Sequence, residues 1–235
     1  MRRNHNQNVG AALLVTVINY LQRLDFVPYV TLATLALLYY LHLNTFQRTI
    51  GDLAISAEKV LGRRGFFDNL MGFSSGRYSW WEVGIASQLL HLDDLHLYYN
   101  SLSFLHKGAQ LERPTSRGAV GLAALLAVLT VLTPIFYVGL AVAGSSFMPG
   151  LYRQQAVGFS GVIFALKVVC QTSSAGSEVV GGVQVPAKLA AWAELVLIQL
   201  ISPNASFMGH LAGILAGLAV VAAERALLAR RGARR

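Results

Sequence analysis

Long apolar runs separated by short polar segments are the feature that most restricts how this chain can fold. Only 13% of its 235 residues are charged and 54% are hydrophobic, whereas a soluble domain usually carries about 25% charged residues. A soluble fold of this size would lack the polar side chains that are needed to cover its surface. The sequence therefore predicts an all-α polytopic membrane protein and argues against a soluble globular or disordered chain.

The basic character of the chain does not indicate a nucleic-acid-binding protein. The net charge is +8 and the isoelectric point is about 9.9. A nucleic-acid groove needs Lys and Arg clustered on one solvated face, but here the charges lie between apolar runs. We expect the lipid bilayer as a partner, and no nucleic acid. The single cysteine, Cys170, excludes an internal disulfide and a cysteine-rich metal site, and no cofactor is expected.

Six segments are predicted to cross the membrane, at roughly 20 residues a span: 26–43, 89–105, 118–142, 156–169, 187–201 and 208–223. Together they give a membrane domain over 26–224, in which 44–88 form a large first loop with short interfacial helices. Residues 1–25 are an N-terminal region, and 225–235 are a basic tail. The apolar stretch 9–21 is predicted to be an interfacial helix or a continuation of the first span. A cleavable signal peptide fits it poorly, because no small-x-small cleavage site followed by a polar region is present.

The distribution of Lys and Arg predicts the orientation, because cytosolic loops carry an excess of both. Six spans place both termini on one side. That side would hold eleven basic residues: Arg2, Arg3, Lys107, Arg113, Arg117, Lys188, Arg225, Arg230, Arg231, Arg234 and Arg235. The other side would hold six: Arg48, Lys59, Arg63, Arg64, Arg77 and Arg153. Both termini are therefore predicted to be cytosolic.

His96 and Asn100 form the first polar cluster within an apolar segment. They are four residues apart, which places them on one face of a helix, and both can donate hydrogen bonds to an anion. Taken by itself, such a pair is better explained by a polar contact between helices. A metal site with His91, Asp94 and His96 fits less well, because residues five apart on a helix point about 140° apart.

Ser160 lies between small residues in Gly158-Phe-Ser-Gly161, at the start of a short apolar helix. Flanking glycines allow a substrate backbone to approach the hydroxyl, and the free N–H groups of a helix start can stabilise an oxyanion. The motif differs from the G-x-S-x-G elbow of soluble hydrolases. Close helix packing is the alternative explanation for the small residues.

His210 begins a second polar motif, together with Gly213 and Gly217. The two glycines form a G-x-x-x-G face, which permits close helix contact, and His210 lies on roughly the same face. A histidine there can act as a base for a residue on the neighbouring helix. A glycine packing face with an incidental histidine remains an alternative. Glu194, within another span, is interpreted mainly as a structural partner for Lys167 or Lys188, with a proton-relay group as the alternative.

The three motifs are more specific together than separately. With both ends cytosolic, the spans near His91, Ala156 and Met208 all enter from the non-cytosolic side. His96, Ser160 and His210 then lie at a similar shallow depth. A serine, a general base and two oxyanion donors are the minimum set for acyl transfer.

At this point the sequence resembles the rhomboid family of intramembrane serine proteases, over roughly 28–225. The H-x-x-x-N, G-x-S-G and H-x-x-G-x-x-x-G motifs occur in the family's order. Within it the chain is most similar to the endoplasmic-reticulum branch called rhomboid-related protein 4. The stretches that carry this resemblance are 30–37, 93–98, 156–161, 164–167, 192–196 and 206–215.

The resemblance implies a six-helix bundle with Ser160 as nucleophile and His210 as general base and acid. It also implies an oxyanion hole formed by His96, Asn100 and the backbone N–H of Ser160. Supporting positions would be Gly158, Gly161, Phe164, Gly213, Gly217 and His91. No metal and no third carboxylate would be needed. The implied substrates are transmembrane proteins, with membrane-protein quality control in the endoplasmic reticulum or another secretory-pathway membrane as the setting.

Two positions depart from the family pattern. Many rhomboids carry Trp-Arg in the first loop, where this chain has Trp81-Glu82, so the anchoring of that loop is in question. Many also have a tyrosine four residues after the serine, where Phe164 stands here, which keeps a stacking ring and loses the hydroxyl.

Two other functions were weighed. A non-proteolytic rhomboid-like protein could bind membrane clients and assist their extraction, but such proteins lack the serine or the histidine, and this chain keeps both. A small transporter or channel would predict inverted repeats or broken helices at mid-membrane, and the sequence shows neither.

Overall fold

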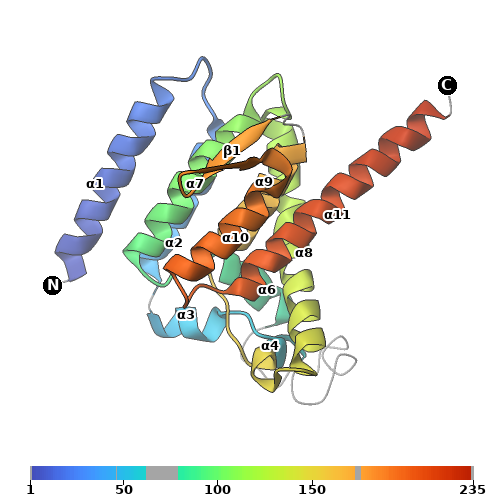
Figure 1. Cartoon of the computed structure of the whole chain (residues 1–235). Coiled ribbons are helices and arrows are strands. Elements are labelled where there is room, and N and C mark those ends of the chain that lie inside the picture. The colour runs from blue at the N-terminus through green and yellow to red at the C-terminus, as the bar shows by residue number, and fades with distance from the viewer. Residues whose placement is uncertain (1, 46, 62–78, 173–175, 234–235) are drawn as a thin grey trace.

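The computed structural model describes residues 2–45, 47–61, 79–172 and 176–233, and within these ranges the fold is mainly helical (Figure 1). The helices of the bundle are α1 (Arg2–Leu21), α2 (Tyr29–Asn44), α7 (Asp94–Glu112), α8 (Gly118–Ser145), α9 (Ser160–Thr172), α10 (Ala190–Ile201) and α11 (Phe207–Gly232). Short helices α3 (Gln47–Leu53), α4 (Ala57–Leu61) and α6 (Trp80–Leu89) gather at one end. Single 3-10 turns, η1 (Pro149–Tyr152) and η2 (Ala187–Leu189), connect the remaining elements.

Two helices, α8 and α11, are long and apolar enough to cross a membrane by length and composition. Helix α9 is apolar but shorter, with 13 residues. It is almost completely buried, since every residue from Gly161 to Gln171 lies in the interior, and it packs most extensively against α11. The number of spans, six, therefore stays a prediction.

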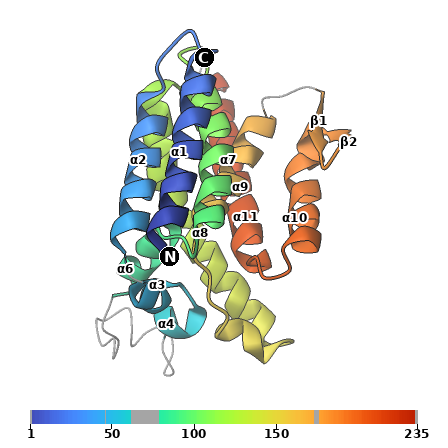
Figure 2. The same ribbon diagram turned by 90° about the vertical axis from the view of Figure 1, so that its left-hand side faces the viewer.

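The stretch 9–21 belongs to a separate helix, α1, and does not continue the first predicted span. Helix α1 packs against α7, and the segment 22–28 reverses the chain before α2 begins (Figure 2). As a result, the first described residue and the end of α11 lie at opposite ends of the bundle. The structure thus gives no support to termini that share one side, and the cytosolic placement of both ends stays a prediction.

A β-hairpin interrupts the helical pattern and was missed by the all-α prediction. Strands β1 (Ser177–Val180) and β2 (Val183–Pro186) pair antiparallel, with Val180 opposite Val183. The two residues between them, Gly181 and Gly182, have φ of +59° and +85°, which is the backbone that a tight two-residue hairpin requires. The predicted span 187–201 accordingly becomes helical only from α10 onward.

The basic tail is not separate from the last helix. Helix α11 continues to Gly232, because Ala, Leu and Arg are all strong helix formers. Arg117, at the start of α8, forms a two-pronged ion pair with Glu224 of α11, at 2.6 and 2.8 Å. This pair fixes α11 against α8 where the predicted membrane domain ends.

A buried carboxylate joins α2 to α7. Glu112, at the end of α7, accepts hydrogen bonds from the backbone N–H groups of Val30 and Thr31 at 2.7 and 2.8 Å, and from the Thr31 hydroxyl at 2.8 Å. These donors belong to the first turn of α2, where backbone N–H groups have no partner within the helix and where negative charge is favourable. The end of α7 is therefore held against the start of α2.

The first loop contains short helices, as predicted, although 62–78 lie outside the described residues. Lys59 donates to the carbonyl oxygens of Gly51 and Ala54 at 2.6 and 2.8 Å, which caps the end of α3. At the start of α6, the N–H and hydroxyl of Ser79 donate to the Glu82 carboxylate at 2.6 and 2.7 Å. These bonds favour the charged carboxylate and lower the pKa of Glu82. Glu82, which stands where many rhomboids have Arg, thus caps a helix of this loop.

Candidate active site

Ser160 is the first residue of α9, and its approach is fixed by three backbone contacts. Ile55 and Ala156 exchange both backbone hydrogen bonds at 2.9 Å, and the Gly158 N–H donates to the Ser87 carbonyl at 2.7 Å. Gly158 has φ of +121°, a conformation open to glycine and strained for other residues. The first loop and α6 thereby set the direction in which the chain enters α9.

His210 lies in the first turn of α11 and faces Ser160. Its Nε2 is 3.0 Å from the Ser160 Oγ, a hydrogen-bond distance. Ser206 caps this helix start, since its hydroxyl accepts from the Gly209 N–H at 3.1 Å. The imidazole stacks on Phe164, with centroids 4.6 Å apart and planes at 27°. Among the described residues, the buried Nδ1 of His210 has no hydrogen-bond partner, so packing rather than a carboxylate orients the ring.

Small residues bring α9 and α11 close enough for this contact. A Cβ on Gly213 would lie 2.7 Å from the Gly161 carbonyl carbon, and one on Gly217 would lie 2.6 Å from the Ala165 carbonyl oxygen. A Cβ on Gly161 would meet Thr133 of α8 at 2.8 Å. All three distances are too short for a side chain, so the glycine face predicted from G-x-x-x-G is the contact between the two helices.

His96 and Asn100 lie on one face of α7, as their spacing predicts. The His96 ring lies against the turn before Ser160, because a Cβ on Gly158 would be 2.6 Å from its Nε2. Asn100 is buried, and its amide donates to the His96 carbonyl at 2.8 Å. Asp93 begins the helix by accepting from the His96 N–H at 2.8 Å. The arrangement brings His96 to the turn before Ser160, whereas the hydrogen bond that the structure records for the Asn100 side chain within the described ranges stays within α7.

The geometric reason for excluding a metal at His91 was wrong. His91 precedes α7, which begins at Asp94, so the two histidines are not on one helix, and their rings touch with centroids 5.0 Å apart. Asp94 instead contacts His42 Nε2 at 2.8 Å. Within the described part of the chain, no group of three His, Cys, Asp or Glu side chains is placed to hold a metal.

A small cavity beside Ser160 contains residues that the sequence did not single out. Its volume is about 30 Å³, which is room for roughly one water molecule. Its polar lining includes Ser87, Gln88 and Thr133. Gln88 Oε1 and Thr133 Oγ1 are buried and lack a hydrogen-bond partner among the described residues. Both atoms can therefore form a hydrogen bond to a polar group bound in the cavity. In the sequence, these residues are marked only by the polar pair Ser87-Gln88 at the end of α6 and by Thr133 within the apolar helix α8.

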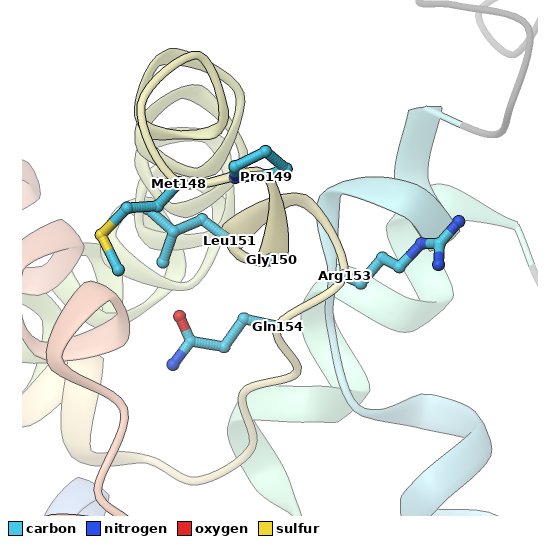
Figure 3. A pocket seen from close by; sticks show the side chains of 6 residues that line it. All are labelled: Met148, Pro149, Gly150, Leu151, Arg153 and Gln154. Atoms are coloured by element: carbon cyan, nitrogen blue, oxygen red, sulfur yellow. The ribbon is translucent and has the colours of Figure 1, made fainter.

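A larger, more open pocket has a different lining, although the carbonyl of its Gln154 accepts a hydrogen bond from Tyr137, which lines the cavity at Ser160. Figure 3 shows its lining, which consists of Met148, Pro149, Gly150, Leu151, Arg153 and Gln154 around η1. It contains none of the side chains that the sequence predicts to act in catalysis. Size is therefore a poor guide to the site in this chain, and we assign the chemistry to the cavity at Ser160.

Glu194 is a structural partner of Lys167, one of the two partners considered for it. The ammonium and the carboxylate form an ion pair between α9 and α10. Lys167 is almost completely buried, whereas Glu194 remains partly exposed. The pair gives an intramembrane lysine the counter-charge that it requires.

Comparisons with known proteins point to one family. Residues 77–226 match the model of the rhomboid domain. The chain is 40% identical to human rhomboid-related protein 4 and 38% identical to the mouse protein of that name, over 92% of its length and 64% of theirs. It is 44% identical to "Rhomboid-like protein 14, mitochondrial" of Arabidopsis thaliana over 56% of this chain and 40% of that protein.

No solved structure matches. The chain spans less than two thirds of the length of the animal proteins it resembles. The predicted resemblance to rhomboid-related protein 4 is confirmed, and the chain belongs to the rhomboid family of integral membrane proteins.

Proposed function

We propose that the chain is an intramembrane serine endopeptidase, with Ser160 as nucleophile and His210 as general base and acid. The observation that carries the proposal is the 3.0 Å contact between Ser160 Oγ and His210 Nε2, in a site reached through a small cavity. A hydroxyl hydrogen-bonded to an imidazole is the arrangement that activates a serine for acyl transfer.

In the first half of the reaction, Ser160 Oγ attacks the carbonyl carbon of the scissile peptide bond. His210 Nε2 takes the hydroxyl proton and then gives it to the departing amine. The C–N bond breaks, and an ester joins the substrate to Ser160. In the second half, water attacks the ester, His210 takes a proton from the water, and the serine hydroxyl is restored as the acid product leaves.

We assign the stabilisation of the oxyanion to His96, Asn100 and the backbone N–H of Ser160. Backbone N–H groups in the first turn of α9 have no acceptor within the helix. His96 lies next to this turn, because its ring contacts Gly158 in the segment that leads into α9. Donors fixed in place before the reaction are worth about 10²–10³ in rate each at such sites.

The membrane setting defines the substrate class that we propose. The substrates are single-span or unstable membrane proteins, cleaved near the end of a helix, where the scissile bond can become extended. A role in membrane-protein quality control in the endoplasmic reticulum, or in another secretory-pathway membrane, is part of this proposal. It rests on the similarity to rhomboid-related protein 4.

The experiment is labelling of the purified chain with a fluorophosphonate probe, which reacts with activated serines and needs no known substrate. We expect covalent labelling of Ser160 in the native chain and none after Ser160→Ala. A folded native chain that stays unlabelled would contradict the proposal. It would favour a client-binding role that does not depend on peptide hydrolysis.

A further inference from the structure

The polar pair Lys167–Glu194 has no part in the reaction as described, yet it lies directly behind the general base. Lys167 Nζ is 5.0 Å from the centroid of the Phe164 ring, within the range of a cation–π interaction. The same ring stacks on His210 with 4.6 Å between centroids. A chain of contacts thus runs from Glu194 through Lys167 and Phe164 to His210.

The orientation of His210 depends on this chain of contacts more than in a carboxylate-supported site. No described residue bonds to its Nδ1, so rotation of the imidazole is limited by the hydrogen bond of its Nε2 to Ser160 Oγ and by the stacked ring of Phe164. The phenyl ring has no hydroxyl through which a hydrogen bond could fix it. Apart from the imidazole of His210, the ammonium of Lys167 is the only polar group that the structure records against the Phe164 ring within the described residues.

Lys167 is also unusual for its position. It is buried among apolar residues of α9, and a lysine within a membrane domain carries a high cost unless it is paired. Glu194 comes from another helix, α10, and supplies the pairing. A second pair, Lys107–Glu178 at 3.5 Å, joins α7 to the hairpin and is partly exposed. An ion pair that only joined α9 to α10 would not require the Lys167 ammonium to contact the Phe164 ring, which stacks on His210.

We propose that Lys167, held by Glu194, is a positioning residue for the general base: its ammonium fixes the Phe164 ring, and the ring fixes His210 against Ser160. This inference rests on the proposed function. It does not make Lys167 a catalytic residue, because the side chain touches neither substrate nor the reacting atoms.

The decisive variant is the neutral double substitution Lys167→Met/Glu194→Gln. Methionine keeps the length and apolar stem of lysine, and the double change leaves no unpaired charge. The readouts are the rate of fluorophosphonate labelling, the turnover and KM for a model membrane substrate, and the thermal unfolding temperature. Lys167→Arg is the variant that keeps a cation able to stack on an aromatic ring. Glu224→Gln, which breaks the Arg117 pair, is the control for loss of an ion pair elsewhere.

We expect the double variant to fold, to bind substrate with unchanged KM, and to label and turn over about tenfold more slowly, which is the scale of one cation–π contact. Glu224→Gln, at a partly exposed pair, should stay within about twofold of the native rates, and Lys167→Arg, which keeps a cation beside Phe164, should be slowed less than the double variant. The inference is overturned if the folded double variant labels and turns over at native rates, or if it changes only KM. It is also overturned if Glu224→Gln is slowed equally. A native chain that does not label at all would instead remove the proposed function itself.

Discussion

Gly213→Ala tests whether the close contact of α9 and α11 sets the distance between Ser160 and His210. The added Cβ would lie 2.7 Å from the carbonyl carbon of Gly161 and 3.0 Å from its Cα, whereas unbonded carbons approach to about 3.5–4.0 Å. Both obstacles are backbone atoms, so no side chain can rotate away. The helices must separate by about 1 Å.

The separation acts directly on the site, because Gly161 follows Ser160 and Gly213 is one turn from His210. The contact of 3.0 Å would lengthen to about 4 Å, beyond a hydrogen bond. A displacement of about 1 Å can cost on the order of 10²-fold in rate. Overpacking of this kind costs about 1–3 kcal/mol in stability.

Labelling rate and thermal unfolding, measured on the same detergent-purified samples, separate the two effects. The matched control is Gly139→Ala on α8, where an added Cβ meets nothing within 4 Å and alanine favours the helix. We expect Gly213→Ala to remain folded with labelling reduced about 100-fold, and Gly139→Ala to behave as the native chain. Native labelling by Gly213→Ala would refute the argument that this helix contact positions the dyad.

Three further substitutions test other parts of the site. His210→Ala should match Ser160→Ala in severity, and the double variant should be no slower than either, since nucleophile and base act as a unit; cleavage rates of the three variants decide this. Asn100→Ala should lower turnover on the order of 10²-fold with little change in affinity, whereas Leu102→Ala should spare turnover; a change in affinity alone would make Asn100 a packing residue. Lys59→Met should lower the unfolding temperature, because it removes the bonds that cap α3, with native melting as the opposing result.

The sequence predicted the mainly helical fold and the close contact between the helices that carry Ser160 and His210, because both depend on local patterns. The roles of the site residues stay predictions. Apolar runs located the helices α2, α8 and α11. The spacing of Gly213 and Gly217 predicted a close helix contact, which the structure places at Gly161, next to Ser160. Contacts of this kind follow from residue size and helix period, so the sequence alone can predict them.

Other features depend on contacts between distant segments, which local patterns do not encode. The chain reverses after α1, and this depends on packing against α7 rather than on the apolar stretch itself. The hairpin has a local signal, Gly181-Gly182 between β-branched residues, but the lengths of the apolar runs alone do not reveal it. The side-chain oxygens of Gln88 and Thr133 have no hydrogen-bond partner within the described residues. Only the packing of α6 and α8 shows that both line the cavity at Ser160.

Cleavage of a single-span membrane substrate in proteoliposomes tests the central claim most directly. The native chain and Ser160→Ala are reconstituted in equal amounts with the same substrate, and the new N-terminus is identified by mass spectrometry. The account predicts one cleavage near the end of the substrate helix for the native chain, and none for Ser160→Ala with an unchanged unfolding temperature. Cleavage by Ser160→Ala at the native rate would contradict the assignment of Ser160 as the nucleophile.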